Sequence, residues 1–389
     1  MPATGRRVME GAVKWEGVLS VPQSGIYEFV LEGVEHADLL VDGQSAIFRW
    51  GAEGASRGSR RLELAAGVPH AVTVVLRAIR DQVRIRLGWV PPWQASATEN
   101  DEEMAAAIRQ ADAVLFFGGL DHQSDVEGAD RCDLGLPGGQ DALIARVTAI
   151  NPRTVVVLAG GSPVVMPWLD RVPAVLWMWY AGMEGGNAVA DVLLGRVNPC
   201  GKLPFTFPAR LQDSPAHALH DYAPEKCRYQ EGVFVGYRWF DARGIAPLFC
   251  FGHGLSYTSF IYDDLEVAAH GHGRGWRGTV SARITNAGSR PGAEVAQLYL
   301  EDVEASQPRP PRELKGFVKL RLKPGESRRV VFRLKADDLA FFCPVTGRWV
   351  AEPGRFRVHL GASSRDLRLT GGFTYAVNKT ASGGYAALG

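Results

Sequence analysis

An apolar segment followed by a charged loop between glycines constrains this 389-residue chain more than any other feature. Residues 113–117, AVLFF, have the composition of a buried strand, and residues 140–150 have the pattern of a helix. The loop between them is rich in acids and closes with Pro137-Gly138-Gly139. In an α/β sheet, ligands usually bind at the carboxyl ends of the strands. We therefore expect residues 118–140 to form the main functional site.

Strand-like and helix-like segments alternate from residue 102 to residue 194. After the helix-like residues 102–111, predicted strands occupy residues 113–117, 154–158 and 174–179. Predicted helices at 140–150, near Trp168 and before Leu194 separate or follow these strands. Such alternation predicts a mostly parallel sheet with crossover helices, followed by a coil-rich segment at 199–260.

The sequence on either side of this region predicts β structure. Short alternating segments before residue 95 indicate about half of a β-sandwich, with an Asp-Gly turn after one strand. Segments from residue 276 onward have the strand spacing of a second sandwich. We predict a multidomain α/β plus all-β protein: a partial β-sandwich at 1–95, an open α/β sandwich at 96–262, a C-terminal β-sandwich at 263–376 and a loose tail at 377–389.

Charge and cysteine content exclude several classes of function. The formal net charge is +1, from 43 Lys and Arg against 42 Asp and Glu, so we expect neither nucleic acid nor a membrane surface as a partner. Five widely spaced cysteines lack metal-ligand spacing, so we expect neither structural zinc nor a disulfide framework. We also expect no other metal and no cofactor. No segment has the pattern of a signal peptide or a membrane span, which favours a cytoplasmic location.

The loop offers several carboxyl groups for acid–base chemistry. A carboxyl group among glycines and beside an arginine suits a general acid, because neighbours can tune its pKa and the backbone admits a substrate. Spacing alone does not separate Glu127 from Asp121, Asp125 or Asp130, all near Arg131. Two alternatives remain: the acids cap the next helix or pair with Arg131, or they bind calcium. The alternating ladder of an EF-hand is absent.

Other motifs have ordinary structural interpretations. Gly160-Gly161-Ser162 lacks the lysine and spacing of a P-loop, so we expect a plain turn. Glu184 precedes a helix start and is expected to cap it. His253, among glycines and aromatic residues, is expected to be packed and hydrogen-bonded. No GxSxG motif is present to support Ser/His/Asp catalysis.

Five sequence blocks, in order, resemble glycoside hydrolase family 3, the β-glucosidase family. They are EGADR at 127–131 with LGLPGGQ at 134–140, WYAGMEGGNAVADVL at 179–193, NPCGKLPFTFP at 198–208, YQEGVFVGYRWFD at 229–241 and PLFCFGHGLSYTSF at 247–260. The C-terminal region, with NAG at 286–288 and EVAQLYL at 294–300, is similar to that family's fibronectin-III-like domain. The opening β region resembles the later part of a PA14 domain.

The resemblance implies that Glu127 is the acid/base of a retaining glycosidase, with Asp125, Asp130 and Arg131 as candidate substrate-binding residues. It also implies a nucleophilic aspartate on a separate (β/α)8 barrel in a Ser-Asp-Trp setting. No Ser-Asp-Trp occurs here, so we expect that this chain alone does not hydrolyse glycosides.

Two functions from different classes follow from the resemblance. The first is the C-terminal portion of a β-glucosidase, with a β-glucoside or oligosaccharide as substrate and a separate barrel domain or chain as partner. The second is a non-catalytic carbohydrate-binding or scaffolding protein derived from that family. Glu127 has a chemical role in the first and none in the second.

Overall fold

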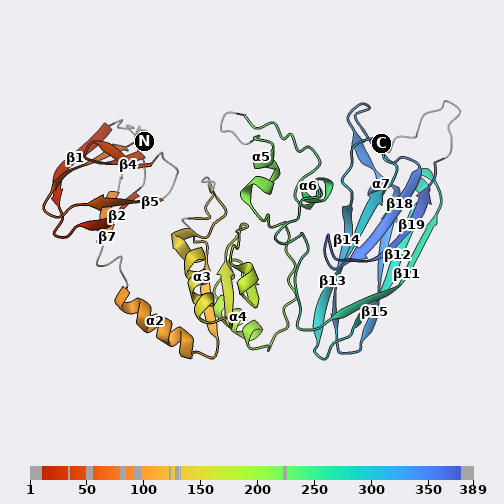
Figure 1. The fold of residues 1–389 in the computed structure, drawn as a ribbon. Helices are drawn as coiled ribbons and strands as arrows, with labels where there is room; N and C mark the ends of the chain where they lie inside the picture. Colours follow the sequence, from red (N-terminus) through yellow and green to blue (C-terminus); the bar gives the residue numbers. More distant parts are fainter. Residues whose placement is uncertain are drawn as a thin grey trace, which may run out of the picture. The chain divides into compact units, whose positions relative to one another are not determined.

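The computed structural model describes residues 11–33, 36–49, 56–78, 85–90, 98–121, 124–127, 131, 133–221 and 226–377 (Figure 1). The chain divides into two compact units. One comprises Met1–Cys132, Leu136–Ser162 and Pro167–Tyr180, and the other comprises Asp133–Gly135, Pro163–Met166 and Ala181–Gly389. No helix in the described ranges is long and apolar enough to cross a membrane.

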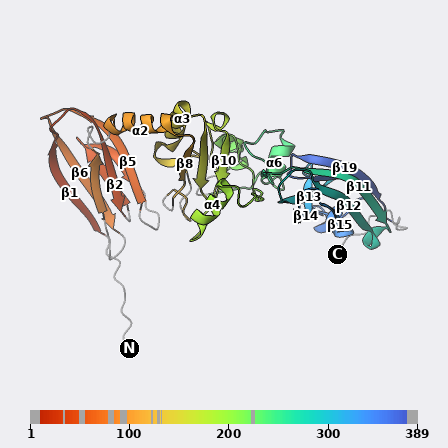
Figure 2. The ribbon, with the colours of Figure 1, turned by 90° about the horizontal axis from the view of Figure 1, so that it is seen from below.

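Two antiparallel sheets form the first β region, at the red end of the chain in Figures 1 and 2. One sheet has the order β1 (Gly11–Ser20), β6 (Pro69–Ala78), β3 (His36–Val41), β4 (Gln44–Arg49). The other has the order β5 (Ser56–Leu64), β2 (Gly25–Gly33), β7 (Ile85–Val90). Asp42 and Gly43, both with positive φ, make the predicted Asp-Gly turn between β3 and β4. Tyr27, Leu31 and Leu39 are fully buried in the core that the two sheets share.

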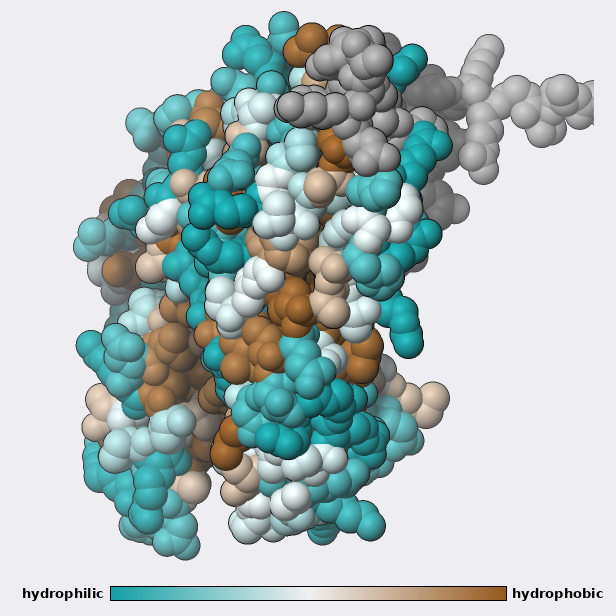
Figure 3. All heavy atoms as spheres, turned by 90° about the vertical axis from the view of Figure 1, so that its right-hand side faces the viewer, coloured by the Kyte–Doolittle hydropathy of each residue, from teal (hydrophilic) through white to brown (hydrophobic). Residues whose placement is uncertain are grey.

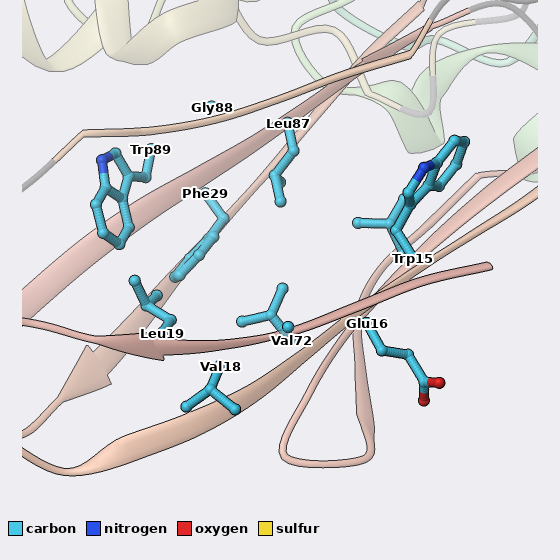
Figure 4. Close-up of a pocket in the computed structure, with 11 residues that line it drawn as sticks. Trp15, Glu16, Val18, Leu19, Phe29, Val72, Leu87, Gly88 and Trp89 are labelled. Atoms are coloured by element: carbon cyan, nitrogen blue, oxygen red, sulfur yellow. The ribbon is translucent and has the colours of Figure 1, made fainter.

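One side of this sandwich is open and apolar (Figure 4). The side chains of Trp15, Leu19, Phe29, Leu87 and Trp89 line a cavity of about 410 Å³ beside the edge strands β1 and β7. Trp15 is 46% exposed and Trp89 is 43% exposed, although both point toward the cavity between the sheets. The apolar interior of the sandwich is therefore accessible from this side.

The central region has the predicted parallel sheet. Its strands lie in the order β10 (Ala174–Trp177), β9 (Thr154–Ala159), β8 (Val114–Gly119). Helices α2 (Thr98–Gln110) and α3 (Gln140–Ile150) contact each other, and α3 packs on β8 and β9 through buried residues such as Ile144. The strand predicted to reach Trp179 ends at Trp177, because Trp179 has a φ of 57°.

In the described part of the segment after this sheet, the helices are short, as its composition predicts. The second unit contains α4 (Gly185–Leu193), α5 (Pro215–Ala218), α6 (Tyr237–Ala242) and the 3-10 turn η3 (Leu211–Asp213). The Trp239 indole donates a hydrogen bond to the Asp213 carbonyl and anchors α6. The 3-10 turns η1 (Pro137–Gly139) and η2 (Leu169–Arg171) lie earlier in the chain, and η4 (Gly273–Gly275) follows later.

A second β-sandwich completes the chain. One sheet has the order β11 (Phe260–His270), β12 (Arg277–Asn286), β15 (Ser327–Lys335), and the other has the order β14 (Glu313–Leu322), β13 (Gly292–Asp302), β18 (Gly354–Gly361), β19 (Leu367–Tyr375). The small hairpin β16 (Phe341–Cys343) and β17 (Arg348–Val350) follows α7 (Ala336–Leu339). Hydrophobic side chains form patches among hydrophilic ones on the face drawn in Figure 3. The predicted loose tail lies outside the described residues from residue 378 onward.

Candidate active site

The side chain of Gln140 joins the two ends of the predicted site loop by hydrogen bonds. Gln140, the first residue of α3, accepts a hydrogen bond from the Gly119 N–H (2.8 Å) and donates to the carbonyls of Gly119 (2.9 Å) and Pro137 (3.0 Å). Gly119 has a φ of 130°, and a Cβ at this position would lie 1.9 Å from the carbonyl oxygen of Ala159. The loop therefore leaves the sheet through a backbone conformation that requires glycine.

Asp125 fixes the middle of the loop to residues that follow the other two strands of the sheet. Its carboxylate accepts hydrogen bonds from the Gly161 N–H (2.9 Å), the Ser162 hydroxyl (2.8 Å) and the Tyr180 hydroxyl (2.8 Å). Arg131 also donates to the Ser162 hydroxyl, at 3.2 Å. Residues that follow β8, β9 and β10 meet here because carboxyl ends of parallel strands share one edge of the sheet.

These contacts shift two pKa values in opposite directions. Burial opposes ionisation of Asp125, but the hydrogen bonds from Ser162, Tyr180 and Gly161 and the charge of Arg131 outweigh it, so the pKa of Asp125 is lowered. Burial and the hydrogen bond to the ionised Asp125 raise the pKa of Tyr180 to about 12. Asp125 is therefore an anionic anchor at neutral pH and is poorly suited to donate a proton.

The lowered pKa predicts how the anchor responds to acid. Because the folded pKa of Asp125 lies below the unfolded value, its stabilising effect is full above that unfolded value, about 3.9, and is lost as the pH falls through the folded pKa. At pH 7 we expect Asp125→Asn to lower the free energy of unfolding by about 1–2 kcal/mol. Urea denaturation measures this as a lower midpoint concentration. The difference from wild type should shrink below pH 4.

Asp170→Asn is the matched control, because Asp170 is an exposed aspartate in the same unit. It should leave the urea midpoint unchanged at both pH values. Equal stability of wild type and Asp125→Asn at pH 7 would show that Asp125 is not an anchor.

Glu127, two residues after this anchor, has the opposite environment. Its side chain is exposed, and among the residues that the structure describes its carboxylate has no hydrogen-bond or ion-pair partner. The neighbouring Val126 is 44% exposed. Within the described part of the loop, the Glu127 carboxyl group is thus uncommitted, two residues from the Asp125 anchor and exposed to a ligand.

Two other acids of the loop that the structure describes hold backbone in place. Asp121 accepts hydrogen bonds from both the backbone N–H and the hydroxyl of Ser124, each at 2.8 Å. Asp133 accepts from the Gly135 N–H at 2.8 Å. Asp130, the remaining candidate for substrate binding, lies outside the described residues. The described His, Cys, Asp and Glu side chains form no group of three or more that could hold a metal ion.

Sequence reasoning missed a second support of the loop. Asp141 accepts hydrogen bonds from the Leu136 N–H (2.9 Å) and from the indole of Trp168 (2.7 Å), whose side chain is fully buried. Ser162 and Tyr180 were also missed as partners of Asp125. The signal available was their position shortly after β9 and β10, which share the parallel sheet with β8.

Three smaller predictions have mixed outcomes. Gly160-Gly161-Ser162 is a turn, as predicted, but it binds the Asp125 carboxylate. Glu184 occupies the N-cap of α4, as predicted, but its carboxylate accepts a hydrogen bond from the Asn187 side chain (2.6 Å) instead of from a backbone N–H. His253 is packed as predicted, stacking on Phe249 with ring centroids 5.1 Å apart, but its imidazole has no hydrogen-bond partner among the described residues, so the predicted hydrogen bond is wrong.

This architecture defines the chain as a multidomain α/β protein with a carboxylate-bearing loop at the carboxyl edge of its parallel sheet. Residues 35–257 match the model of the glycosyl hydrolase family 3 C-terminal domain, which is more than half of the chain. Residues 294–364 match the fibronectin type III-like domain. The chain therefore belongs to glycosyl hydrolase family 3. The family match begins inside the first β region, whose PA14-like character stays a prediction.

Named relatives of this chain are β-glucosidases. It is 41% identical over 292 residues to Beta-glucosidase BoGH3A of Bacteroides ovatus, covering 74% of this chain and 39% of that protein. It is 37% identical over 395 residues to the probable β-glucosidase I of Aspergillus terreus, covering 95% of this chain and 46% of that protein. This chain thus spans less than half the length of these two relatives.

Solved structures of β-glucosidases share the fold. The structure of DesR, a β-glucosidase from Streptomyces venezuelae in complex with D-glucose, aligns with a TM-score of 0.75 and 35% identity. That alignment covers 94% of this chain and 46% of DesR. The β-glucosidase of Kluyveromyces marxianus in complex with glucose aligns with a TM-score of 0.73 and 30% identity, over 94% of this chain and 45% of that protein.

Proposed function

We propose that this chain supplies the general acid/base, Glu127, for a retaining β-glucosidase-type hydrolysis of terminal β-D-glucosyl residues. The observation that carries the proposal is the contrast within the loop. Asp125 is consumed by three hydrogen bonds, whereas the Glu127 carboxylate is exposed and uncommitted. A group that protonates a leaving oxygen must reach the substrate, and Glu127 meets that requirement.

The chemistry needs a second carboxylate. In the retaining mechanism one carboxylate attacks the anomeric carbon, and the acid/base first protonates the leaving oxygen and then deprotonates the water that releases the sugar. The two carboxyl groups stand about 5–5.5 Å apart. The residues that the structure describes form no (β/α)8 barrel. We assign the nucleophile to a barrel domain supplied from elsewhere, and we keep Asp125, Asp130 and Arg131 as candidate substrate-binding residues.

This assignment predicts complementation. The chain alone is expected to leave a chromogenic β-glucoside intact, because an acid/base without a nucleophile cannot form the covalent intermediate. When the chain is mixed with a separately expressed family 3 barrel, the rate of chromophore release should rise in proportion to the concentration of the complex between them. Turnover by the chain alone that disappears in Glu127→Gln would contradict the assignment of the nucleophile.

A second candidate is a non-catalytic carbohydrate-binding module. The observation that favours it is the pair of half-exposed indoles, Trp15 and Trp89, at the open side of the first sandwich (Figure 4). Exposed aromatic rings can stack on sugar rings. If this is the function, Trp15→Ala should abolish oligosaccharide binding, and no mixture with a barrel should turn over glycoside.

The predicted domain boundaries belong to the same proposal. We propose the first β domain at 1–95, the α/β domain at 96–262 and the fibronectin-like domain at 263–376. The proposed boundary between residues 262 and 263 falls within β11, which spans Phe260–His270.

A further inference from the structure

A polar cavity in the second unit is separate from the site loop. It has a volume of about 310 Å³ and is lined by the chain on either side of Lys202 and His253, by Glu294 on β13 and by the segment that leads into β19. Phe260 and Leu255 contribute apolar surface. A volume of about 300 Å³ is at the lower end of the range found for small-molecule sites.

Two ion pairs in this cavity leave it with no net charge. Lys202 lies 3.0 Å from Glu294, and these side chains are 14% and 6% exposed. Arg368 lies 2.8 Å from Asp366. Burial of such pairs is costly unless their remaining hydrogen-bonding capacity is also satisfied. The cavity therefore contains two positively charged donors and two negatively charged acceptors.

Several of these groups retain unused hydrogen-bonding capacity. Glu294 Oε1 accepts from Lys202 and from the Val295 N–H, whereas Oε2 has no partner among the described residues. The Lys202 ammonium contacts Glu294 and the Gly254 carbonyl, which leaves it one donor. The imidazole of His253 has no hydrogen-bond partner within the described chain, and its pKa is lowered by burial and by the charge of Lys202. A neutral imidazole can both donate and accept.

We propose that this cavity binds a small neutral polyhydroxylated molecule, of the size and chemistry of a monosaccharide. Each hydroxyl group can donate to Glu294 and accept from Lys202 or Arg368, so a polyol matches the mixed donors and acceptors of the site. An anion would face Glu294 and Asp366, and a cation would face Lys202 and Arg368. The proposal rests on this cavity and does not depend on the role of Glu127.

Such a ligand would connect two parts of the second unit. Lys202 and His253 belong to the segment before β11, and Glu294 and Arg368 belong to strands of the sandwich. A molecule that contacts both groups binds the folded arrangement and raises its stability with concentration.

The test is calorimetric titration of the full chain with D-glucose, with myo-inositol as a second neutral polyol and acetate as an anionic probe. We expect both polyols to bind and acetate not to bind. His253→Phe retains the stacking on Phe249 but removes both ring nitrogens, and is expected to weaken binding about tenfold, the effect of one hydrogen bond. Leu255→Trp, at a 77% exposed position on the cavity, should obstruct entry without affecting folding.

Two controls separate this site from the others. His270→Phe makes the same chemical change at an exposed histidine outside the cavity, and should leave the affinity unchanged. Glu127→Gln should also leave it unchanged, so that failure of the proposed acid/base role and failure of this site remain distinguishable. Absence of polyol binding, stronger binding of acetate, or equal affinity of wild type, His253→Phe and Leu255→Trp would overturn the proposal.

Discussion

Glu127→Gln is expected to lower turnover of an unactivated β-glucoside by about 10²–10⁴-fold in the mixture of this chain with a family 3 barrel. The amide keeps the size of the side chain but cannot protonate the leaving oxygen. Because Glu127 is exposed and has no partner among the described residues, the fold and the assembly with the barrel should not change. The measurement is steady-state hydrolysis of cellobiose at matched protein concentration.

The dependence on leaving group makes this prediction specific. A dinitrophenolate leaves without protonation, so a dinitrophenyl glucoside should form the glycosyl-enzyme intermediate at a nearly normal rate and show a burst. Asp170→Asn, which changes an exposed aspartate outside the loop, is the matched control and should retain wild-type turnover. Equal losses for activated and unactivated substrates would argue against an acid/base role.

Gly119→Ala is expected to destabilise the α/β sheet by about 3 kcal/mol or more, since the added Cβ must displace strand backbone. The Cβ would lie 1.9 Å from the Ala159 carbonyl oxygen, and the φ of 130° is unfavourable for alanine. Hydrogen exchange of the amides in β8 and β9 measures the effect locally, which matters because a multidomain chain need not unfold in one step.

Gly186→Ala provides the control for this glycine. A Cβ at Gly186 meets no atom within 4 Å, and the residue is helical in α4. Alanine there should change stability by less than about 1 kcal/mol, in the stabilising direction. If the amides of β8 and β9 exchanged as slowly in Gly119→Ala as in wild type, the position would not require glycine.

Much of the fold could be predicted from local pattern. The strand at 113–117, the helix at 140–150 and the parallel sheet follow from apolar periodicity and from strands that alternate with helices. β11 and β19 were not predicted: β11 was expected to begin as coil, and β19 contains Gly371 and Gly372, which are poor strand formers. The latter strand exists because it pairs along β18.

The site was harder to predict than the fold. Sequence spacing could not separate Glu127 from Asp125, because both are acids in one glycine-bounded loop. The two acids differ because Ser162 and Tyr180 donate hydrogen bonds to Asp125. These donors lie 37 and 55 positions after Asp125 in the sequence. That contact depends on the register of three parallel strands, which local pattern does not specify.

The most direct test of the central claim is azide rescue of Glu127→Ala in the reconstituted mixture, with a dinitrophenyl β-glucoside as substrate. Removing the acid/base leaves the glycosyl-enzyme intermediate without a general base for water, and the vacated space admits azide, which needs no deprotonation to attack. We predict that azide accelerates turnover and yields glucosyl azide of β configuration. If azide leaves the rate unchanged and no glucosyl azide forms, while the same mixture made with wild-type chain is active, Glu127 is not the acid/base.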